Sequence, residues 1–385
     1  MHCLHSVFEG FVDLSIYKQL GIRRVVNGID HLTLLGGSVL PKEVMDAIIE
    51  ANNYFVDMDE LLTKSGEFVA ELLGAESAFV TSGAFAGLVL ASSACMTRDD
   101  RELMERLPYT KGMRNEIIIQ KGLRSEYDRA MTVPGARLVE VGDEKETTQK
   151  HMEEAINERT AAIHFLAPGG RKGTIPFEEI ISIAKDHDVP VIVDAAGQVL
   201  PLENLKKYIA MGADLVCYGA KYFEGPNSAG ILCGRKNLVA AAKLQTFVGF
   251  ESQGIRAIGR GMKLDRQEVI GTIVALQRWL NMDHKARLQV QNRRINYLVD
   301  ELNKLKGVEA KISGERMGIP ISADVILDQE ILDFKAQEVV EFLKNGDPSV
   351  WVGLREGIIV ISADTFVEGD EEEIIKALKG VINRH

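Results

Sequence analysis

The stretch ADLVCYGAKYFEGPNSAGILCG, residues 213–234, decides how the chain is expected to fold. Two apolar runs, 213–219 and 228–234, are joined by a turn of small residues that carries one lysine, Lys221. The turn is shorter than the dozen or more residues of a crossover connection, so we expect the two runs to form antiparallel strands. The lysine is either a solvated side chain or a reactive group, and the surrounding sequence bears on that choice.

Further short β-branched runs precede this pair, with helical stretches between them. They are SAFVTSG (77–83), EIIIQ (116–120), ARLVEVG (136–142), TAAIHFL (160–166) and VPVIVDAAG (189–197). Strands that alternate with helices indicate parallel βαβ units. Nearly continuous apolar strands such as VPVIV are typical of a sheet covered on both faces. We therefore predict an α/β fold with a seven-stranded, mostly parallel sheet and one antiparallel member.

The pattern changes after residue 265. A long helix is predicted from 266 to about 306, then short strands near 308–312, 322–328 and 357–362, and a final helix that starts with acidic residues. This mixture indicates a smaller α+β domain. We predict a large domain over 46–262 and a discontinuous smaller domain made of 1–45 and 263–385.

Charge and hydropathy exclude some classes of partner. The chain has 56 acidic and 45 basic residues, a formal charge of −11, and its basic residues are scattered. Nucleic-acid binding requires clustered Lys and Arg, so we expect no nucleic-acid partner. No apolar run approaches the roughly 18 residues that would suggest a membrane span, and we expect no membrane partner.

The start of the chain and the cysteines indicate a cytoplasmic protein without a structural metal. The first 21 residues read as an amphipathic helix and lack the pattern of a signal peptide. Cys3, Cys95, Cys217 and Cys233 show no CxxC spacing. We therefore predict reduced, buried thiols, and neither a zinc site nor a disulfide framework.

Ligands of open α/β sheets bind beyond the carboxyl ends of the strands, so residues that follow strands are the first site candidates. The first strand is followed by Thr81-Ser82-Gly83-Ala84 and an apolar helix, an arrangement that presents backbone amides to an anion. An ordinary helix N-cap would look the same. The turn matches neither nucleotide-binding fingerprint, which disfavours dinucleotides and ATP.

Asp194 closes the VPVIV strand, and Lys221 follows the next strand along the chain. A carboxylate that emerges from an apolar strand needs a partner, and a cationic ring nitrogen would serve. Taken alone, Asp194 is more often a turn cap and Lys221 a solvated lysine. Small neighbours let a ligand approach the backbone closely, and a lysine in a partly apolar site can act as a nucleophile or base.

The order TSGA, then VDAAG, then GAK followed by EGPNSAGILCG resembles the fold-type-I pyridoxal-phosphate (PLP) enzymes, the aminotransferase-like fold. Within them it is similar to the branch related to bacterial selenocysteine synthase. The resemblance extends over most of the chain, from VVNGIDHLTLLGGS near the start to GIRAIGRGMKLDRQEVIG. It implies a PLP-dependent enzyme that acts as a homodimer or as an assembly of dimers.

The resemblance also implies roles for the strand-end residues. Lys221 would hold PLP as a Schiff base, Asp194 would pair with the pyridine nitrogen, and Ser82, Gly83 and Ala84 would hold the phosphate. Gly225, Pro226 and Asn227 look like the Gly-Pro-Gln segment that approaches the cofactor of a neighbouring subunit. Two positions depart from the pattern: Tyr218 stands where selenocysteine synthases carry Ser, and Leu123 where a His is expected in close relatives. The Tyr218 phenol is thus a candidate phosphate ligand.

Two groups of the branch differ in how well they match. A selenocysteine synthase must grip a charged tRNA, which does not suit an acidic chain. The segments LGGS, FVDMDEL, TSGAFAG and IGRGMK are more similar to the D-glucosaminate-6-phosphate ammonia-lyases. That resemblance implies replacement of Lys221 by the substrate amine, loss of the α-proton, elimination of the β-hydroxyl, and hydrolysis to a 2-keto-3-deoxy acid and ammonia. Aminotransferase, racemase and aldolase activities stay open, and a non-enzymatic module is disfavoured by the retained Lys221 and Asp194.

A small anionic amino acid or amino-sugar acid would need cationic groups around it, and guanidinium suits carboxylate and phosphate alike. Arg260, Lys263 and Arg355 are the candidates, and His31 in the N-terminal glycine-rich segment is a weaker one. His164 ends a strand near the expected site, where orienting and packing roles compete equally. For each arginine a plain surface ion pair is at least as common a role.

Overall fold

The computed structural model describes residues 16–143 and 145–382. Its contacts divide the chain into two compact units, residues 40–282 and residues 1–39 with 283–385. The sequence predicts these boundaries at 46 and 263. They fall elsewhere because the helix α12 (Arg266–Asn281) packs on α2 (Lys42–Ala51) and α3 (Met58–Leu73), which places all three helices in the larger unit.

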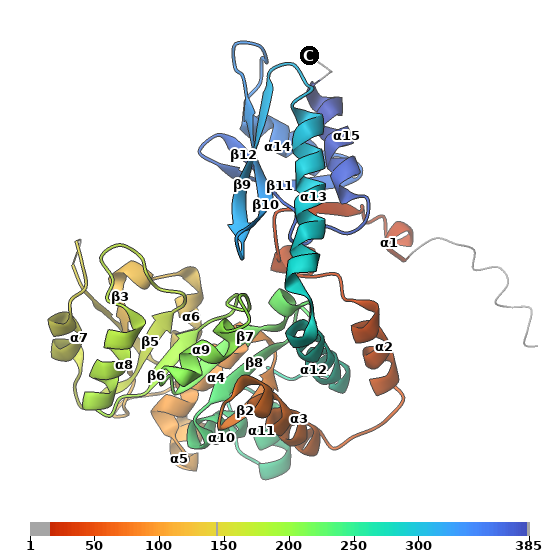
Figure 1. The fold of residues 1–385 in the computed structure, drawn as a ribbon. Helices are drawn as coiled ribbons and strands as arrows, with labels where there is room; N and C mark the ends of the chain where they lie inside the picture. The colour runs from red at the N-terminus through yellow and green to blue at the C-terminus, as the bar shows by residue number, and fades with distance from the viewer. Residues whose placement is uncertain (1–15, 144, 383–385) are drawn as a thin grey trace, which may run out of the picture. The chain divides into compact units, whose positions relative to one another are not determined.

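The larger unit is built around a seven-stranded sheet with the order β2-β8-β7-β6-β5-β3-β4 (Figure 1). Its strands are β2 (Ser77–Thr81), β3 (Glu116–Gln120), β4 (Arg137–Val141), β5 (Thr160–Leu166), β6 (Val191–Asp194), β7 (Leu215–Gly219) and β8 (Gly230–Gly234). The strand β8 is antiparallel to both β2 and β7, and the other pairs are parallel. The predicted α/β sheet and its antiparallel member are confirmed.

Helices cover both faces of this sheet, and each face has its own apolar core. One core includes residues of α2, α3, α12, α7 (Gln149–Ala155), α8 (Phe177–Asp186) and α9 (Asn204–Ala210). The other includes residues of α4 (Gly83–Thr97), α5 (Arg101–Arg106), α6 (Arg129–Thr132) and α10 (Lys236–Leu244). The remaining helical segments are α11 (Phe247–Gln253), η2 (Lys121–Leu123), η3 (Glu126–Asp128) and η4 (Ala220–Phe223). We call the second face the α4 face.

The smaller unit has a five-stranded sheet with the order β1-β11-β12-β10-β9. Its elements are α1 (Ile16–Gln19), β1 (Val25–Gly28), η1 (Thr33–Leu35), α13 (His284–Leu302), β9 (Val308–Arg316), β10 (Ile319–Leu327), α14 (Ala336–Asn345), β11 (Ser349–Arg355), β12 (Ile358–Ser362) and α15 (Asp370–Ile382). Alternate residues of β10 are buried, and they join α13, α14 and α15 in one core. The predicted α+β character is thus observed in this unit.

Two local expectations differ from the structure. The long helix predicted from 266 is two helices, because the Asp283 side chain accepts a hydrogen bond from the Ala286 amide at 3.0 Å and caps a new helix, α13. The amphipathic helix predicted at the start falls largely on residues 1–15, outside the described residues. Among the described residues, every helix is too short or too polar to cross a bilayer.

Candidate functional site

Three strands of the larger unit end at the same edge of the sheet. β2 and β7 are parallel to each other because β8 is antiparallel to both, and β6 is parallel to β7. Their carboxyl ends lead to Ser82, Asp194 and the η4 turn that carries Lys221. The residues that the sequence singles out are therefore gathered at the edge where open α/β sheets bind ligands.

Lys221 lies on η4, directly after β7, and its side chain is half-buried. Its Nζ is 5.0 Å from the centre of the Tyr222 ring. The Tyr222 ring fills the space beside Gly219, where a Cβ would come within 3.1 Å of it. The turn is closed by the Gly225 amide, which donates to the Ala220 carbonyl at 2.9 Å. The lysine is thus held on a short, well-connected turn.

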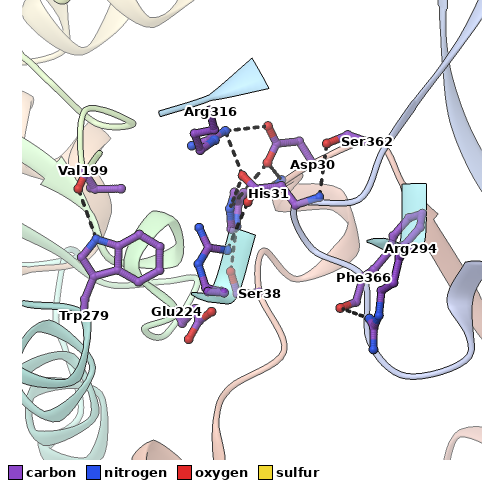
Figure 2. Close-up of polar contacts among 12 residues, drawn as sticks. Asp30, His31, Ser38, Val199, Glu224, Trp279, Arg294, Arg316, Ser362 and Phe366 are labelled. Carbon is purple, nitrogen blue, oxygen red and sulfur yellow. Dashed lines mark hydrogen bonds and ion pairs between the residues drawn. The ribbon is translucent and has the colours of Figure 1, made fainter. Parts of the chain in front are cut away.

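A second set of contacts fixes this turn to α12. The Glu224 carboxylate pairs with the Arg278 guanidinium, and the Trp279 indole N–H donates to the Val199 carbonyl at 3.2 Å (Figure 2). Glu224 adopts a left-handed backbone conformation, with φ of 59°. A non-glycine residue in that region is uncommon and needs such support. The Glu224–Arg278 pair therefore holds the turn that carries Lys221 against α12, and the Trp279 contact holds α12 against the segment after β6.

Asp194 is 5% exposed at the end of β6. Its Oδ1 accepts one hydrogen bond, from the Ala196 amide at 3.1 Å. Burial raises the pKa of this carboxyl to about 6, and the nearby Asp128 charge acts in the same direction. A buried carboxylate in this state would gain greatly from a cationic ligand.

The first turn of α4 presents backbone amides at the end of β2. Its N-cap residue, Ser82, makes no side-chain capping bond, so these amides are left for a ligand. Gly83 has φ of 87°, and a Cβ at Gly230 would lie 2.7 Å from the Ala84 nitrogen. The segment that follows the lysine turn therefore packs directly on the start of α4, and both positions require glycine.

His164 lies on β5 next to this edge and is 2% exposed. Neither of its ring nitrogens has a hydrogen-bond partner among the described residues. Burial lowers the pKa of the ring to about 4, although the Asp128 carboxylate acts to raise it. His164 is therefore a neutral, buried and unpaired imidazole.

Asp128, a residue that sequence reasoning passed over, is also buried near this edge. It accepts hydrogen bonds from the Arg124 Nε at 2.5 Å and from the Ser125 amide at 2.9 Å. Its charge acts to raise the pKa of both Asp194 and His164. The segment SEYD matches a capping box, which by itself gives no hint of a role at a site.

The described contacts of Tyr218 differ from the role that the sequence suggests for it. Its hydroxyl donates to the carbonyls of Asn204 (3.1 Å) and Leu205 (3.2 Å) at the start of α9. Tyr218 belongs to the core opposite the α4 face, whereas Cys217, the register partner of Asp194, belongs to the α4 face. Burial raises the pKa of the phenol well above its ordinary value. These contacts account for the phenol within the larger unit, and a contact of Tyr218 with the cofactor phosphate stays a prediction.

Replacing Tyr218 by Phe should therefore affect stability and leave cofactor binding unchanged. The substitution removes a buried hydroxyl from two carbonyls, and we expect a loss of about 1 kcal/mol in the free energy of unfolding. Urea denaturation measures that loss, and a PLP titration of the apoprotein measures the affinity. A large loss of PLP affinity with unchanged stability would restore the phosphate role.

The other residues near the lysine turn have mixed surroundings. Pro226 packs on α12, where a Cβ on Gly271 would come within 3.2 Å of its ring. The Asn227 Oδ1 is buried without a hydrogen-bond partner among the described residues. Leu123, where a His was expected, is 1% exposed and part of the core opposite the α4 face. Asn227 thus has a buried polar group that could contact a ligand, whereas the Leu123 side chain is apolar.

The four candidate substrate residues are divided between the units. Arg260, in the larger unit, pairs with Glu251 at 2.6 Å and stacks on the Phe250 ring. Lys263, in the same unit, is exposed. Arg355, in the smaller unit, is largely exposed and pairs with Asp324 at 3.2 Å.

His31, also in the smaller unit, belongs to an ion-pair network (Figure 2). Its Nδ1 is 2.8 Å from the Ser38 Oγ, and its Nε2 lies 3.5 Å from Asp30 and 3.8 Å from Asp364. The two carboxylates and the ring have donor atoms close enough to hold a metal ion. Arg316 already pairs with Asp364 at 2.8 Å, so the network carries its own cation.

The edge of the larger sheet fits PLP. Asp194 is a buried carboxylate for which the described residues show no ion pair, and a protonated pyridine nitrogen would supply the missing cation. The uncapped first turn of α4 suits a phosphate, and Lys221 lies on the adjoining turn. The donor set matches the cofactor without any rearrangement of the sheet.

Comparisons with known proteins agree with this fit. A family model described as SelA, L-seryl-tRNA selenium transferase, matches residues 26–312. A D-glucosaminate-6-phosphate ammonia lyase of Salmonella typhimurium is 32% identical over 95% of this chain and 98% of its own length. A 5'-C-glycyluridine monooxygenase-decarboxylase of a Streptomyces species is 31% identical over 96% of this chain and 92% of its own length. A solved structure of a D-glucosaminate-6-phosphate ammonia-lyase superposes with a TM-score of 0.86 at 30% identity, over 97% of this chain and 99% of that one.

These likenesses extend over nearly the whole chain, and the architecture is that of the fold-type-I PLP enzymes. The cofactor is therefore pyridoxal 5'-phosphate and the protein is an enzyme. One edge of the larger sheet brings together uncapped amides, a buried carboxylate and a lysine turn. The family model matches this chain over residues 26–312. The chain therefore belongs to the SelA family of PLP-dependent enzymes.

Proposed function

We propose that the protein is a PLP-dependent ammonia-lyase that acts on a small anionic amino-sugar acid such as D-glucosaminate 6-phosphate. The observation that carries the proposal is the 32% identity to an ammonia lyase of that name across nearly both full lengths. The relation to selenium transferases is weaker, with 24% identity to the enzyme of Carboxydothermus hydrogenoformans over 66% of its length.

The proposed roles follow the edge of the larger sheet. Lys221 would bind the cofactor covalently, and Asp194 would face its pyridine nitrogen. The amides and hydroxyl around Ser82, Gly83 and Ala84 would hold its phosphate. Asn227, whose Oδ1 is buried without a partner among the described residues, would contribute a polar contact beside Gly225 and Pro226.

When it is bound, PLP supplies an electron sink that makes the α-proton of the substrate acidic. Lys221 would take that proton at its Nζ as the general base. The electron pair of the broken C–H bond would form the new C=C bond, and the β-hydroxyl would take up one proton and leave as water. Hydrolysis of the resulting enamine consumes one water and releases a 2-keto-3-deoxy acid and ammonia, so the substrate yields these two products without net gain or loss of water.

An anionic substrate would be held by exchange of ion-pair partners. Arg260 would leave Glu251, and Arg355 would leave Asp324, for a carboxylate or phosphate of the substrate. Both pairs lie at the surface, where an ion pair contributes little, so the exchange costs little. Lys263 and His31 are the further proposed contacts.

We also propose a homodimer located in the cytoplasm. Three buried free cysteines suit a reducing compartment. The larger unit exposes several apolar side chains between residues 49 and 55. Phe55 is 97% exposed, and Tyr54 and Ile49 are also exposed. Exposed apolar groups of this kind mark protein–protein contacts, and a second copy of this chain would cover them.

Replacing Phe55 by Asp should weaken the dimer. A central aromatic contact commonly dominates an interface, so we expect the dimer dissociation constant to rise by about 30-fold or more. Sedimentation velocity over a concentration series measures it. Tyr109→Asp is the matched control, because Tyr109 is also a strongly exposed aromatic residue of this unit. A monomeric wild-type protein, or equal effects of both substitutions, would contradict the assignment.

A substrate panel tests the proposed reaction against its alternatives. D-Glucosaminate 6-phosphate should release ammonia and a keto acid, whereas an aminotransferase would require an added amino acceptor. Formation of the enantiomer or of an aldehyde would indicate racemase or aldolase activity. Oxygen consumption with 5'-C-glycyluridine would indicate the activity named for the Streptomyces relative. Tight, salt-sensitive binding of seryl-tRNA would indicate the activity named for the selenium transferases.

A further inference from the structure

A pocket of about 320 Å³ lies at the edge of the larger sheet opposite the one that carries Asp194 and Lys221. Residues 110–115, 158 and 159 line it, and they lead into the amino ends of β3 and β5. Because β3, β5, β6 and β7 are parallel to one another, the amino ends of β3 and β5 lie away from the carboxyl ends of β6 and β7. The pocket is therefore separate from the groups that the proposed reaction uses.

The lining of this pocket is basic, although the chain as a whole is acidic. Lys111, Arg114 and Arg159 are its cationic members, and Glu158 is its acidic member. Over the whole chain, acidic residues outnumber basic ones by 56 to 45. A local excess of positive charge in a hollow of the surface raises the concentration of small anions there.

Lys111 and Arg114 have no carboxylate partner of their own. Both side chains are exposed, and neither forms an ion pair or a hydrogen bond within residues 16–143 and 145–382. Arg124, by comparison, pairs with Asp128 at 2.5 Å. The donors of Lys111 and Arg114 can therefore bind an anion without breaking an existing ion pair.

Arg159 is held in place by a buried carboxylate. Glu116 is 2% exposed and accepts hydrogen bonds from the Arg159 Nε at 2.5 Å and from the Arg137 Nη2 at 2.6 Å. These two guanidinium groups and one carboxylate together keep a positive charge. The terminal nitrogens of Arg159 have no partner in the described part of the chain. Because the guanidinium is already oriented, it loses little freedom when these nitrogens bind a phosphate.

Backbone donors lie beside these cations. A tight turn is closed by the Met113 amide, which donates to the Thr110 carbonyl at 3.0 Å, and Gly112 has φ of 81°. Among the described residues, the amides of Lys111, Gly112 and Arg114 make no hydrogen bond. Unpaired amides on a closed turn, next to Lys and Arg side chains, are the donors that phosphate sites combine.

We propose that this pocket binds the phosphate of a small phosphorylated molecule, at a site separate from the cofactor and from the substrate of the reaction. Lys111 and Arg114 supply charge, and the terminal nitrogens of Arg159 can make a bidentate contact with two phosphate oxygens. Ligand pockets commonly measure about 300–1,000 Å³, so this one suits a small molecule. A nucleic acid would extend beyond the pocket over the surface of a chain with a charge of −11.

The test is a calorimetric titration of the PLP-loaded protein with inorganic pyrophosphate at low salt. We expect the double variant Lys111→Ala, Arg114→Ala to raise the dissociation constant by about 30-fold or more, because two charged contacts are lost. Its melting temperature should not change, since both side chains are exposed. Lys206→Ala with Lys207→Ala removes the same charge from the exposed face of α9 and should leave the binding as it is. Wild-type affinity in the pocket variant, or equal losses in both double variants, would overturn the proposal.

Chemical labelling of the wild-type protein locates the bound ion. Lysines are acetylated with limiting reagent and analysed by peptide mass spectrometry. At pyrophosphate ten times above the dissociation constant, labelling of Lys111 should fall to about a tenth, while labelling of Lys206 stays the same. Pyrophosphate binding with unchanged labelling of Lys111 would mean that the ion occupies another site, and would contradict the proposal. An oligonucleotide that protects Lys111 at lower concentration than pyrophosphate would do so too, because a polymer would then be the ligand.

Discussion

Lys221→Ala is expected to abolish the reaction and the covalent attachment of PLP. The substitution removes the proposed cofactor-binding amine, which is also the proposed general base, so we expect turnover to fall by about 10⁴-fold or more. Borohydride reduction followed by peptide mass spectrometry should find pyridoxyl-lysine on Lys221 in the wild type and on no lysine in the variant. The Schiff-base absorbance of the wild-type protein should be absent from the variant.

Lys207→Ala is the matched control for this experiment. Lys207 also lies over the ring of the residue that follows it, at 5.6 Å from the centre of Tyr208, but it is exposed on α9. Its loss should leave turnover and the reduced adduct unchanged. A reducible adduct that persists in Lys221→Ala would mean that another lysine binds the cofactor.

Asp194→Asn is expected to stabilise the apoprotein and to impair the enzyme. Burial raises the folded-state pKa of Asp194 to about 6, above its ordinary value of 3.8. A raised pKa means that the protonated carboxyl stabilises the fold below about pH 4, and that this contribution is lost as the pH rises through 6. Asparagine stays neutral, so above pH 6 the variant should be more stable than the wild type by at most about 3 kcal/mol.

The same change should weaken catalysis, because asparagine cannot hold a proton on the pyridine nitrogen. We expect turnover to fall by about 10²- to 10³-fold, the range for loss of a preorganised electrostatic contact. Urea denaturation of both apoproteins at pH 4.5 and pH 7.5 measures the stability difference. Parallel pH dependences of the two proteins would show that Asp194 does not carry an unpaired buried charge.

Local patterns were sufficient to predict the larger sheet. Each of its seven strands is a short apolar run bounded by turn residues, and the short turn around Lys221 is enough to predict the antiparallel pair. The small-residue turns at Ser82 and Lys221 could be recognised for the same reason, because close approach of backbone to ligand restricts which residues are allowed. Strand ends, and with them the candidate site, were therefore accessible from the sequence.

Contacts between distant parts of the chain were not accessible in that way. β1 pairs with β11 although more than 300 residues separate Val25 from Ser349, and neither strand was predicted. Four residues of β1 give too little pattern for a strand prediction. Asp128 was missed because its local pattern is that of an ordinary capping box, whereas its effect on Asp194 and His164 depends on how the sheet places β5 and β6.

The placement of Tyr218 follows from the alternation of its strand. Successive residues of a strand point to opposite faces, and Cys217 is the register partner of Asp194. Tyr218 must therefore face away from Asp194, into the core that α9 covers. The resemblance to a serine at this position suggests a hydroxyl near the phosphate, whereas the described contacts of the Tyr218 phenol are with carbonyls of α9.

The most direct test of the proposed function is the stoichiometry of the reaction with D-glucosaminate 6-phosphate. The PLP-loaded protein is incubated with this compound alone, and ammonia, keto acid and remaining substrate are measured in the same samples. The proposal predicts one ammonia and one 2-keto-3-deoxy acid for each substrate consumed, with no amino acceptor present. Consumption that yields a keto acid without ammonia, or that starts only when an amino acceptor is added, would contradict it.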